Sequence, residues 1–156
     1  RCPMAKFAVN LYFPQSLTRD EALRRLKALP QQSKVSDDPE VGASGMVIWQ
    51  IAATDHQYTA DRIRRSLGMA VGDFYLRLTV SQPDDEDLLE KWDRITDLLE
   101  YGEDAVCLYQ LSDILLIQKD GKLTLDSDSG YQSPVFHNHV KRRRQAEVKP
   151  LGCLQD

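Results

Sequence analysis

The residues with the clearest potential for chemistry lie near the end of the chain, in the stretch "PVFHNHVKRRRQ" from residue 134 to residue 145. Its two histidines, His137 and His139, are one residue apart, and imidazoles at that spacing can bind a metal ion from one face of a strand. A metal site needs a third ligand, and His56 is the only other histidine in the sequence. We therefore predict that this stretch is neither a metal site nor a catalytic motif, and we expect no metal and no cofactor.

A run of four cations follows the histidines, made up of Lys141, Arg142, Arg143 and Arg144. Such a run can bind phosphate groups, serve as a localisation signal, or lie solvated against an acidic surface. From Lys141 to the end the chain carries a net charge of +3, whereas residues 1–140 carry −7. An acidic body repels the phosphates of nucleic acids. The charge distribution predicts a single acidic domain at residues 1–130 and an exposed basic extension at residues 131–156.

Two other groups of residues could do chemistry, but each has a simpler structural explanation. Cys107 could act as a nucleophile, yet it stands in an apolar run without a visible partner, so we expect a small core residue. The acids between Asp84 and Glu90 could bind Mg²⁺ or transfer protons, but at the start of a helix they are explained by the helix dipole. With 3 cysteines and no C-x-x-C pair, a disulfide framework or zinc site is not expected, and a reducing, cytoplasmic setting fits best.

Periodic patterns place strands and helices in alternation along the chain. Strands are predicted at residues 6–13, 46–53, 73–80, 105–118 and 122–127, the fourth with a bend near residue 112. Helices are predicted at residues 18–29, from a second capping pair, Thr54 and Gln57, to about residue 67, and between Pro83 and Gly102. Thr18 and Glu21 have the spacing of a capping box, and Asp120-Gly121 is a hairpin turn. Residues 30–45 show no periodicity and are expected to form a long loop.

The order βαβαβαββ and the alternating strands predict an α/β, more narrowly α+β, fold. Strands that keep one mixed face do not lie between two layers of helices. We therefore expect a two-layer sandwich: a mixed or mostly antiparallel sheet of about five strands with its helices on one face. Leu76, Leu78, Trp92 and Ile95 should lie in the core between the two layers.

The second face of such a sheet should carry the functional residues. The side chains that alternate away from the apolar face are Asn10, Tyr12, Gln50, Tyr75, Arg77 and Tyr109, together with Ile48. Aromatic rings mixed with hydrogen-bonding groups can contact a protein partner or a second copy, stack bases, or hold a small ligand. The simpler alternative is a half-exposed face, or one covered by the end of the chain.

The function predicted from these observations is a non-enzymatic protein-binding domain, physically similar to adaptors, inhibitors and immunity proteins. Common nucleotide-binding and hydrolase motifs are absent from the sequence. Neither a signal peptide nor an apolar run long enough to span a membrane is seen, so no membrane association is expected. One alternative is a nucleic-acid-associated protein that uses the basic extension and the aromatic sheet face. Another is a small enzyme with a pocket between residues 30–45 and the sheet.

Overall fold

The computed structural model describes residues 7–30, 32–33, 36–54, 57–80, 85–110, 112–128 and 135–155. Within these residues the helices are α1 (Arg19–Lys27), α2 (Gln57–Leu67), α3 (Asp85–Leu99) and α4 (Val135–Lys141). The strands are β1 (Phe7–Tyr12), β2 (Gln32–Ser33), β3 (Val41–Ser44), β4 (Val47–Ala53), β5 (Phe74–Val80), β6 (Ala105–Tyr109), β7 (Asp113–Lys119), β8 (Lys122–Asp126) and β9 (Ala146–Lys149). His56 and the predicted helix start at Pro83 and Asp84 lie outside the described residues.

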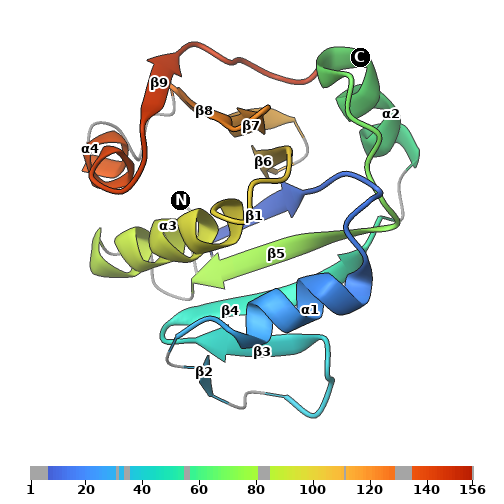
Figure 1. Ribbon diagram of the computed structural model, residues 1–156, viewed down its shortest axis with the longest axis vertical. Helices are drawn as coiled ribbons and strands as arrows, with labels where there is room; N and C mark the ends of the chain where they lie inside the picture. The colour runs from blue at the N-terminus through green and yellow to red at the C-terminus, as the bar shows by residue number, and fades with distance from the viewer. Residues whose placement is uncertain are drawn as a thin grey trace, which may run out of the picture.

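All nine strands form one sheet in the order β2-β3-β4-β5-β1-β6-β7-β8-β9 (Figure 1). Every neighbouring pair is antiparallel except β8 and β9, which are parallel. The prediction of an α/β chain with a mostly antiparallel sheet is confirmed. The predicted size of the sheet is wrong, because nine strands are described rather than about five. The predicted order of elements along the chain, βαβαβαββ, is also wrong, because β2 and β3 come between α1 and β4, and because α4 and β9 follow β8.

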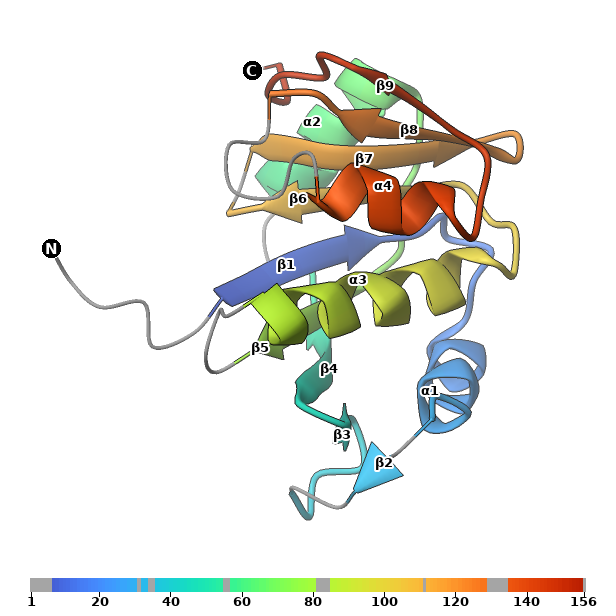
Figure 2. The same cartoon turned by 90° about the vertical axis from the view of Figure 1, so that its left-hand side faces the viewer.

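The helices lie on both faces of the sheet, not on one. Figure 2 shows α3 and α4 on the near side and α2 behind β6, β7 and β8. The reason is visible in β6, where Val106 and Leu108 are fully buried on one face and Cys107 is fully buried on the other. A strand that is apolar on both sides needs cover on both sides. The "AVCL" run of β6 therefore requires a second layer, which α2 and the last residues of the chain provide.

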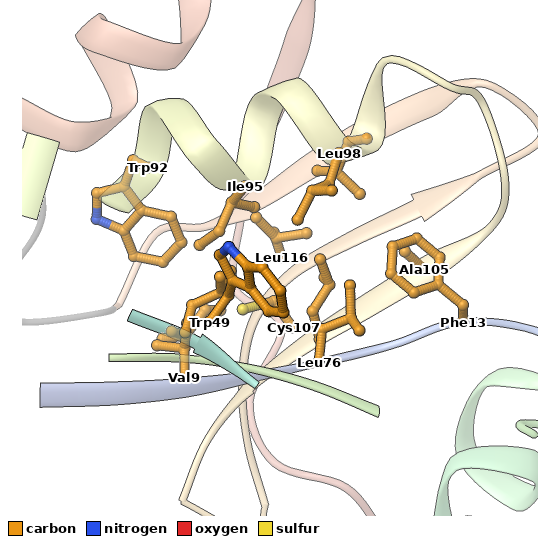
Figure 3. Packing of buried hydrophobic residues seen from close by; sticks show 14 of the residues in the cluster. Val9, Phe13, Trp49, Leu76, Trp92, Ile95, Leu98, Ala105, Cys107 and Leu116 are labelled. Atoms are coloured by element: carbon orange, nitrogen blue, oxygen red, sulfur yellow. The ribbon is translucent and has the colours of Figure 1, made fainter. Parts of the chain in front are cut away.

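The main core lies between the sheet and helices α1, α3 and α4. In Figure 3, Trp92, Ile95 and Leu98 of α3 face Trp49, Leu76 and Cys107 of the sheet. The four residues predicted to lie in the core, Leu76, Leu78, Trp92 and Ile95, are each no more than 1% exposed. A smaller core on the opposite face joins α2 to β6, β7 and the segment after β9. None of the helices in the described part of the chain combines the length and apolar character needed to span a bilayer.

Short-range sequence patterns predicted several boundaries of helices and strands correctly. The backbone N–H of Glu21 donates to Oγ1 of Thr18 at 3.1 Å, so Thr18 is the N-cap of α1. Asp120 and Gly121 both have positive φ, 52° and 79°, as a two-residue hairpin turn of type I′ requires. The predicted strand at 105–118 is instead two strands, β6 and β7, and the chain reverses at Gln110 with φ 57°.

Residues 30–45 contain strands rather than only a loop. β2 and β3 extend the sheet beyond β4, and Gly42 of β3 pairs directly with Trp49 of β4. The indole of Trp49 occupies the space that a side chain at residue 42 would need. Gly42 is therefore found in a strand because the indole of Trp49 leaves no room for a side chain at this position.

We expect Gly42→Ala to destabilise the protein by about 1–3 kcal/mol, the usual cost of overpacking a well-filled site. A Cβ atom at this position would lie 2.2 Å from Cζ2 of Trp49, so the indole must move. Urea denaturation measures the change. Gly121→Ala is a useful comparison, because its Cβ would meet nothing within 4 Å and its cost comes from the positive φ alone. An unchanged free energy of unfolding for Gly42→Ala would contradict this packing.

Residues 135–149 belong to the sheet and the main core rather than to an exposed extension. β9 pairs with β8 over four residues, and Phe136 and Val140 of α4 are each 2% exposed. The ring of Phe136 stacks on Trp92 of α3 with centroids 3.9 Å apart. The sequence shows no strong period here because the helix is only seven residues long and depends on this contact.

Candidate functional site: the open sheet face

Three polar side chains form a row across the middle of the sheet. Gln50 of β4 is directly opposite Arg77 of β5, and Arg77 is directly opposite Asn10 of β1. Directly opposed residues in antiparallel strands point to the same face, with Cβ atoms about 4.5–5.5 Å apart. The sheet thus brings together side chains that are 27 and 67 positions apart in the sequence.

This row lies on the face opposite α1 and α3. The adjacent row, Trp49, Leu78 and Val9, belongs to the main core, and successive residues of a strand point to opposite sides. Helix α2 covers the second face over β6 to β8, but in Figures 1 and 2 no described helix lies over β3, β4 and β5 on that side. We call this area without a described helix over it the open face and define it by ten residues: Ala8, Asn10, Val41, Ala43, Ile48, Gln50, Ala52, Tyr75, Arg77 and Thr79. Of these, Asn10, Ala43 and Thr79 are buried.

The open face combines apolar side chains with a few polar groups. Gln50 and Arg77 are exposed although they lie on interior strands, and Ile48, Ala52 and Tyr75 are half-buried. Arg77 is the one charged residue among the ten, and none of the ten is an acid. Such a surface can donate and accept hydrogen bonds and bury apolar area, which are the properties of a protein interface.

Tyr12 and Tyr75 were both predicted to point to this face, and they do so as a stacked pair with ring centroids 4.9 Å apart. Tyr75 is half-buried, whereas Tyr12 is only 3% exposed because it packs in the smaller core beside Ile63 of α2. Burial, followed by the neighbouring Tyr75, raises the pKa of the Tyr12 hydroxyl above its usual value. Tyr12 therefore supports the edge of the open face but offers no ring for a ligand to stack on.

Asn10 is the least exposed polar residue of the row, at 7%. Its Oδ1 atom is buried and accepts no hydrogen bond within the described structure. An acceptor left without a partner costs about 1–3 kcal/mol. A central strand position of this kind normally holds an apolar residue, so stability alone does not explain an asparagine here.

We expect Asn10→Val to raise the free energy of unfolding by about 1 kcal/mol, because the substitution removes the unsatisfied amide and suits a strand. Chemical denaturation monitored by tryptophan fluorescence measures the change. Thr124→Val on β8, a half-buried strand position outside the open face, serves as the control for strand propensity. A loss of stability for Asn10→Val that exceeds any loss in the control would show that the amide is well satisfied.

Tyr109 lies on the other side of the sheet from the rest of the predicted set. It pairs directly with Val9 and packs against the main core, so it points toward α1 and α3. The alternation of β6 is regular, but the strand is apolar on both sides, with Cys107 buried on one face and Val106 and Leu108 on the other, so the pattern does not show which side faces the main core. Five of the six predicted residues therefore share the predicted face, and four of these belong to the open face itself.

The basic residues do not join the open face, because α4 lies on the α3 side of the sheet (Figure 2). Lys141 and Arg142 are exposed. Arg143 makes ion pairs with Asp93, Asp97 and Glu100 of the α3 region, the Asp97 contact at 2.8 Å. Arg144 donates to the Gln118 side chain. Part of the basic run is thus occupied by the acidic surface of its own chain.

We expect Arg143→Ser to lower stability by about 1 kcal/mol, and less at high salt, because its ion pairs are partly exposed and therefore screened. Arg142→Ser changes the same charge one residue earlier, where the side chain is exposed, and should have an effect within about 0.5 kcal/mol. Thermal melting of both variants at low and high salt makes the comparison. Equal effects of the two variants would contradict the assigned ion pairs.

The two histidines of the opening stretch point in different directions from α4. Nε2 of His137 is 2.9 Å from the carbonyl oxygen of Asp126, and Nε2 of His139 is 2.7 Å from Oδ1 of Asp93. Residues two apart on a helix do not face each other. Across the described residues, no cluster of three or more histidine, cysteine or acidic side chains has the arrangement of a metal site.

Cys107 and Lys91 are buried in the main core, 0% exposed in both cases. Burial raises the pKa of the Cys107 thiol to about 12, so the reactive thiolate does not form near neutral pH. Burial also lowers the pKa of the Lys91 amine, to about 7. Both groups lie on the side of the sheet away from the open face.

Three hollows in the described structure, of about 420, 490 and 320 Å³, are lined by residues outside the open face. The first lies between the ends of α1 and α3, where Pro30 is the one lining residue from the segment 30–45. Its charged groups already pair within the chain: Arg25 with Glu21 and Glu103, and Asp97 with Arg94. Among these three hollows, the segment 30–45 contributes Pro30 alone, and the enzyme pocket between this segment and the sheet stays a prediction.

Comparison with known proteins adds no assignment, since no family model, curated protein or solved structure matches this chain.

Proposed function

We propose that this chain is a binding module that recognises another protein through the open face. The observation that carries the proposal is the exposure of Gln50 and Arg77 on interior strands of the sheet, where no helix of the described residues covers one face of β3, β4 and β5. A protein partner suits exposed polar groups among apolar side chains. A small molecule needs a concave site, and the three hollows described above lie outside the open face.

The basic run supports the nucleic-acid alternative less well. Arg143 and Arg144 contact residues of their own chain, and they lie on the α3 side of the sheet, away from the open face. A binding surface that combined the basic residues with the aromatic sheet face would have to span two opposite sides of the molecule.

The test is affinity capture with the full chain, followed by identification of the bound protein and calorimetry with the purified pair. Ile48→Lys places a long cation in the middle of the open face and should weaken binding at least about tenfold. Leu23→Lys, at a half-buried position on α1, is the matched control and should bind as the wild type does. Thermal melting confirms that both variants are folded. A partner whose affinity falls with Leu23→Lys but not with Ile48→Lys would place the binding surface elsewhere.

A further inference from the structure

Building on the proposed function, we propose that Arg77 is the anchor of the open face and that it receives a carboxylate, an Asp or Glu side chain, of the protein partner. Gln50 and Asn10 stand on either side of Arg77 in the cross-strand row. The guanidinium fork matches a carboxylate with two parallel hydrogen bonds, and the exposed amide of Gln50 can donate to the same oxygens, whereas Asn10 is 7% exposed.

Arg77 shares with Arg65 and Arg142 an exposed side chain that forms no ion pair or hydrogen bond among the described residues, and of these three arginines it is the one in the open face. Within the described residues no ion pair or hydrogen bond engages its side chain, and the open face contains no acid that could do so. By contrast, the arginines that pair with acids of the chain are Arg19, Arg24, Arg25, Arg64, Arg94 and Arg143. An exposed cation in the middle of a largely neutral surface favours an acidic group on the opposing surface.

A second copy of the chain is a poor occupant of this face. A two-fold dimer sets the same patch against itself, so the central row of one copy would face the central row of the other. The two Arg77 side chains would then be close together, and the open face supplies no acid to separate them. Like charges brought together in an interface oppose association.

Nucleic acid is also a poor occupant. Single-stranded nucleic acids are held by a groove with several cations and by aromatic rings on which bases stack. The open face has one cation and one half-buried aromatic ring, Tyr75, since the Tyr12 ring beside it is 3% exposed. A protein carboxylate is therefore the anion that this surface fits best.

The experiment uses a phage-displayed library of random peptides, selected against the full chain. The enriched peptides are synthesised, and their affinities are measured for wild type, Arg77→Gln and Ile48→Lys. Arg65→Gln is the matched control, because Arg65 is exposed on α2, outside the open face. Peptides from the wild-type selection should share an Asp or Glu. Their affinity should fall about 10- to 100-fold with Arg77→Gln and should not change with Arg65→Gln. Changing the peptide acid to its amide should have the same effect as Arg77→Gln, and the two changes together should not add.

The outcomes separate the two proposals. Peptides that are lost with Ile48→Lys but have no shared acid, or that bind Arg77→Gln unchanged, would refute the anchor and leave the binding face standing. A selection in which no enriched peptide is sensitive to Ile48→Lys would contradict the proposed function itself. Sedimentation of the wild type as a dimer that dissociates with Ile48→Lys would identify a second copy as the occupant. Salt-dependent binding of single-stranded DNA that disappears with Arg77→Gln would identify nucleic acid, and either result would overturn the inference.

Discussion

Replacing Lys91 with methionine is expected to stabilise the protein by about 1–4 kcal/mol at neutral pH, the range seen when buried ionic groups give way to apolar ones. Lys91 is 0% exposed on α3, with its amine 4.8 Å from the centre of the Trp92 ring. Methionine has a similar length and an unbranched chain, so it can occupy the same space without the desolvated amine. A lower free energy of unfolding for Lys91→Met, measured in urea at pH 7, would contradict this account of the core.

The effect of Lys91→Met should depend on pH in a defined direction. Burial lowers the pKa of the folded-state amine to about 7, below its usual value of 10.5. Between these two values the unfolded chain binds the proton and the folded chain does not, so wild-type stability contains a contribution that rises with pH. The slope is about 1.4 kcal/mol per pH unit for one proton. The advantage of Lys91→Met should therefore be greatest near pH 7 and should shrink toward pH 10.

The difference between the two proteins isolates this contribution. Other buried groups titrate in the alkaline range, and the raised pKa of Cys107 lowers stability there because the unfolded thiol loses its proton first. Because the Lys91 amine and the Cys107 thiol interact electrostatically, both proteins are compared in a Cys107→Ala background, where the thiol contributes to neither curve. A constant difference between pH 7 and pH 10 would show that the amine stays charged in the folded protein.

Leu78→Ala is expected to destabilise the protein by about 2–5 kcal/mol, through lost burial and the cavity left behind. Leu78 is 0% exposed in β5 and lies directly between Val9 and Trp49 of the neighbouring strands, at the centre of the main core. Gln50→Ala, on the exposed side of the next strand, serves as the control and should change stability within about 0.5 kcal/mol. Equilibrium unfolding of both variants tests the assignment of the two faces. A loss under about 1 kcal/mol for Leu78→Ala would mean that this face of β5 is not the core face.

Alternation in the sequence was sufficient to place the open face, because β1, β4 and β5 are regular. Each has one central polar residue on one side and large apolar residues throughout the other, so Gln50, Arg77 and Asn10 could be assigned to one face before their pairing was known. Their order across the sheet could not be read, since β1 lies between β5 and β6, far from β2 and β3 in the sheet order. Sequence adjacency does not determine such an order.

The predictions failed where long-range packing determines the local structure. Gly42 was predicted to lie in a loop, but it lies in a strand whose neighbour, Trp49, fills the space that a side chain would need. Phe136 reads as part of a tail, but its stack on Trp92 holds α4 in place. Both cases depend on a tryptophan from another part of the chain, which no local pattern reveals. The apolar run at Val106 and Leu108 was the one available sign that helices cover both faces.

Site-specific photo-crosslinking tests the central claim, recognition of a protein through the open face, most directly. A photoreactive amino acid is placed at Gln50 in one protein and at Arg142 in another, both exposed but on opposite sides of the sheet. Each labelled protein is then irradiated in complex with its bound partner. We predict a discrete covalent adduct with a protein from position 50 and none from position 142. An adduct from position 142 alone, whether with a protein or with nucleic acid, would contradict the open face as the binding surface.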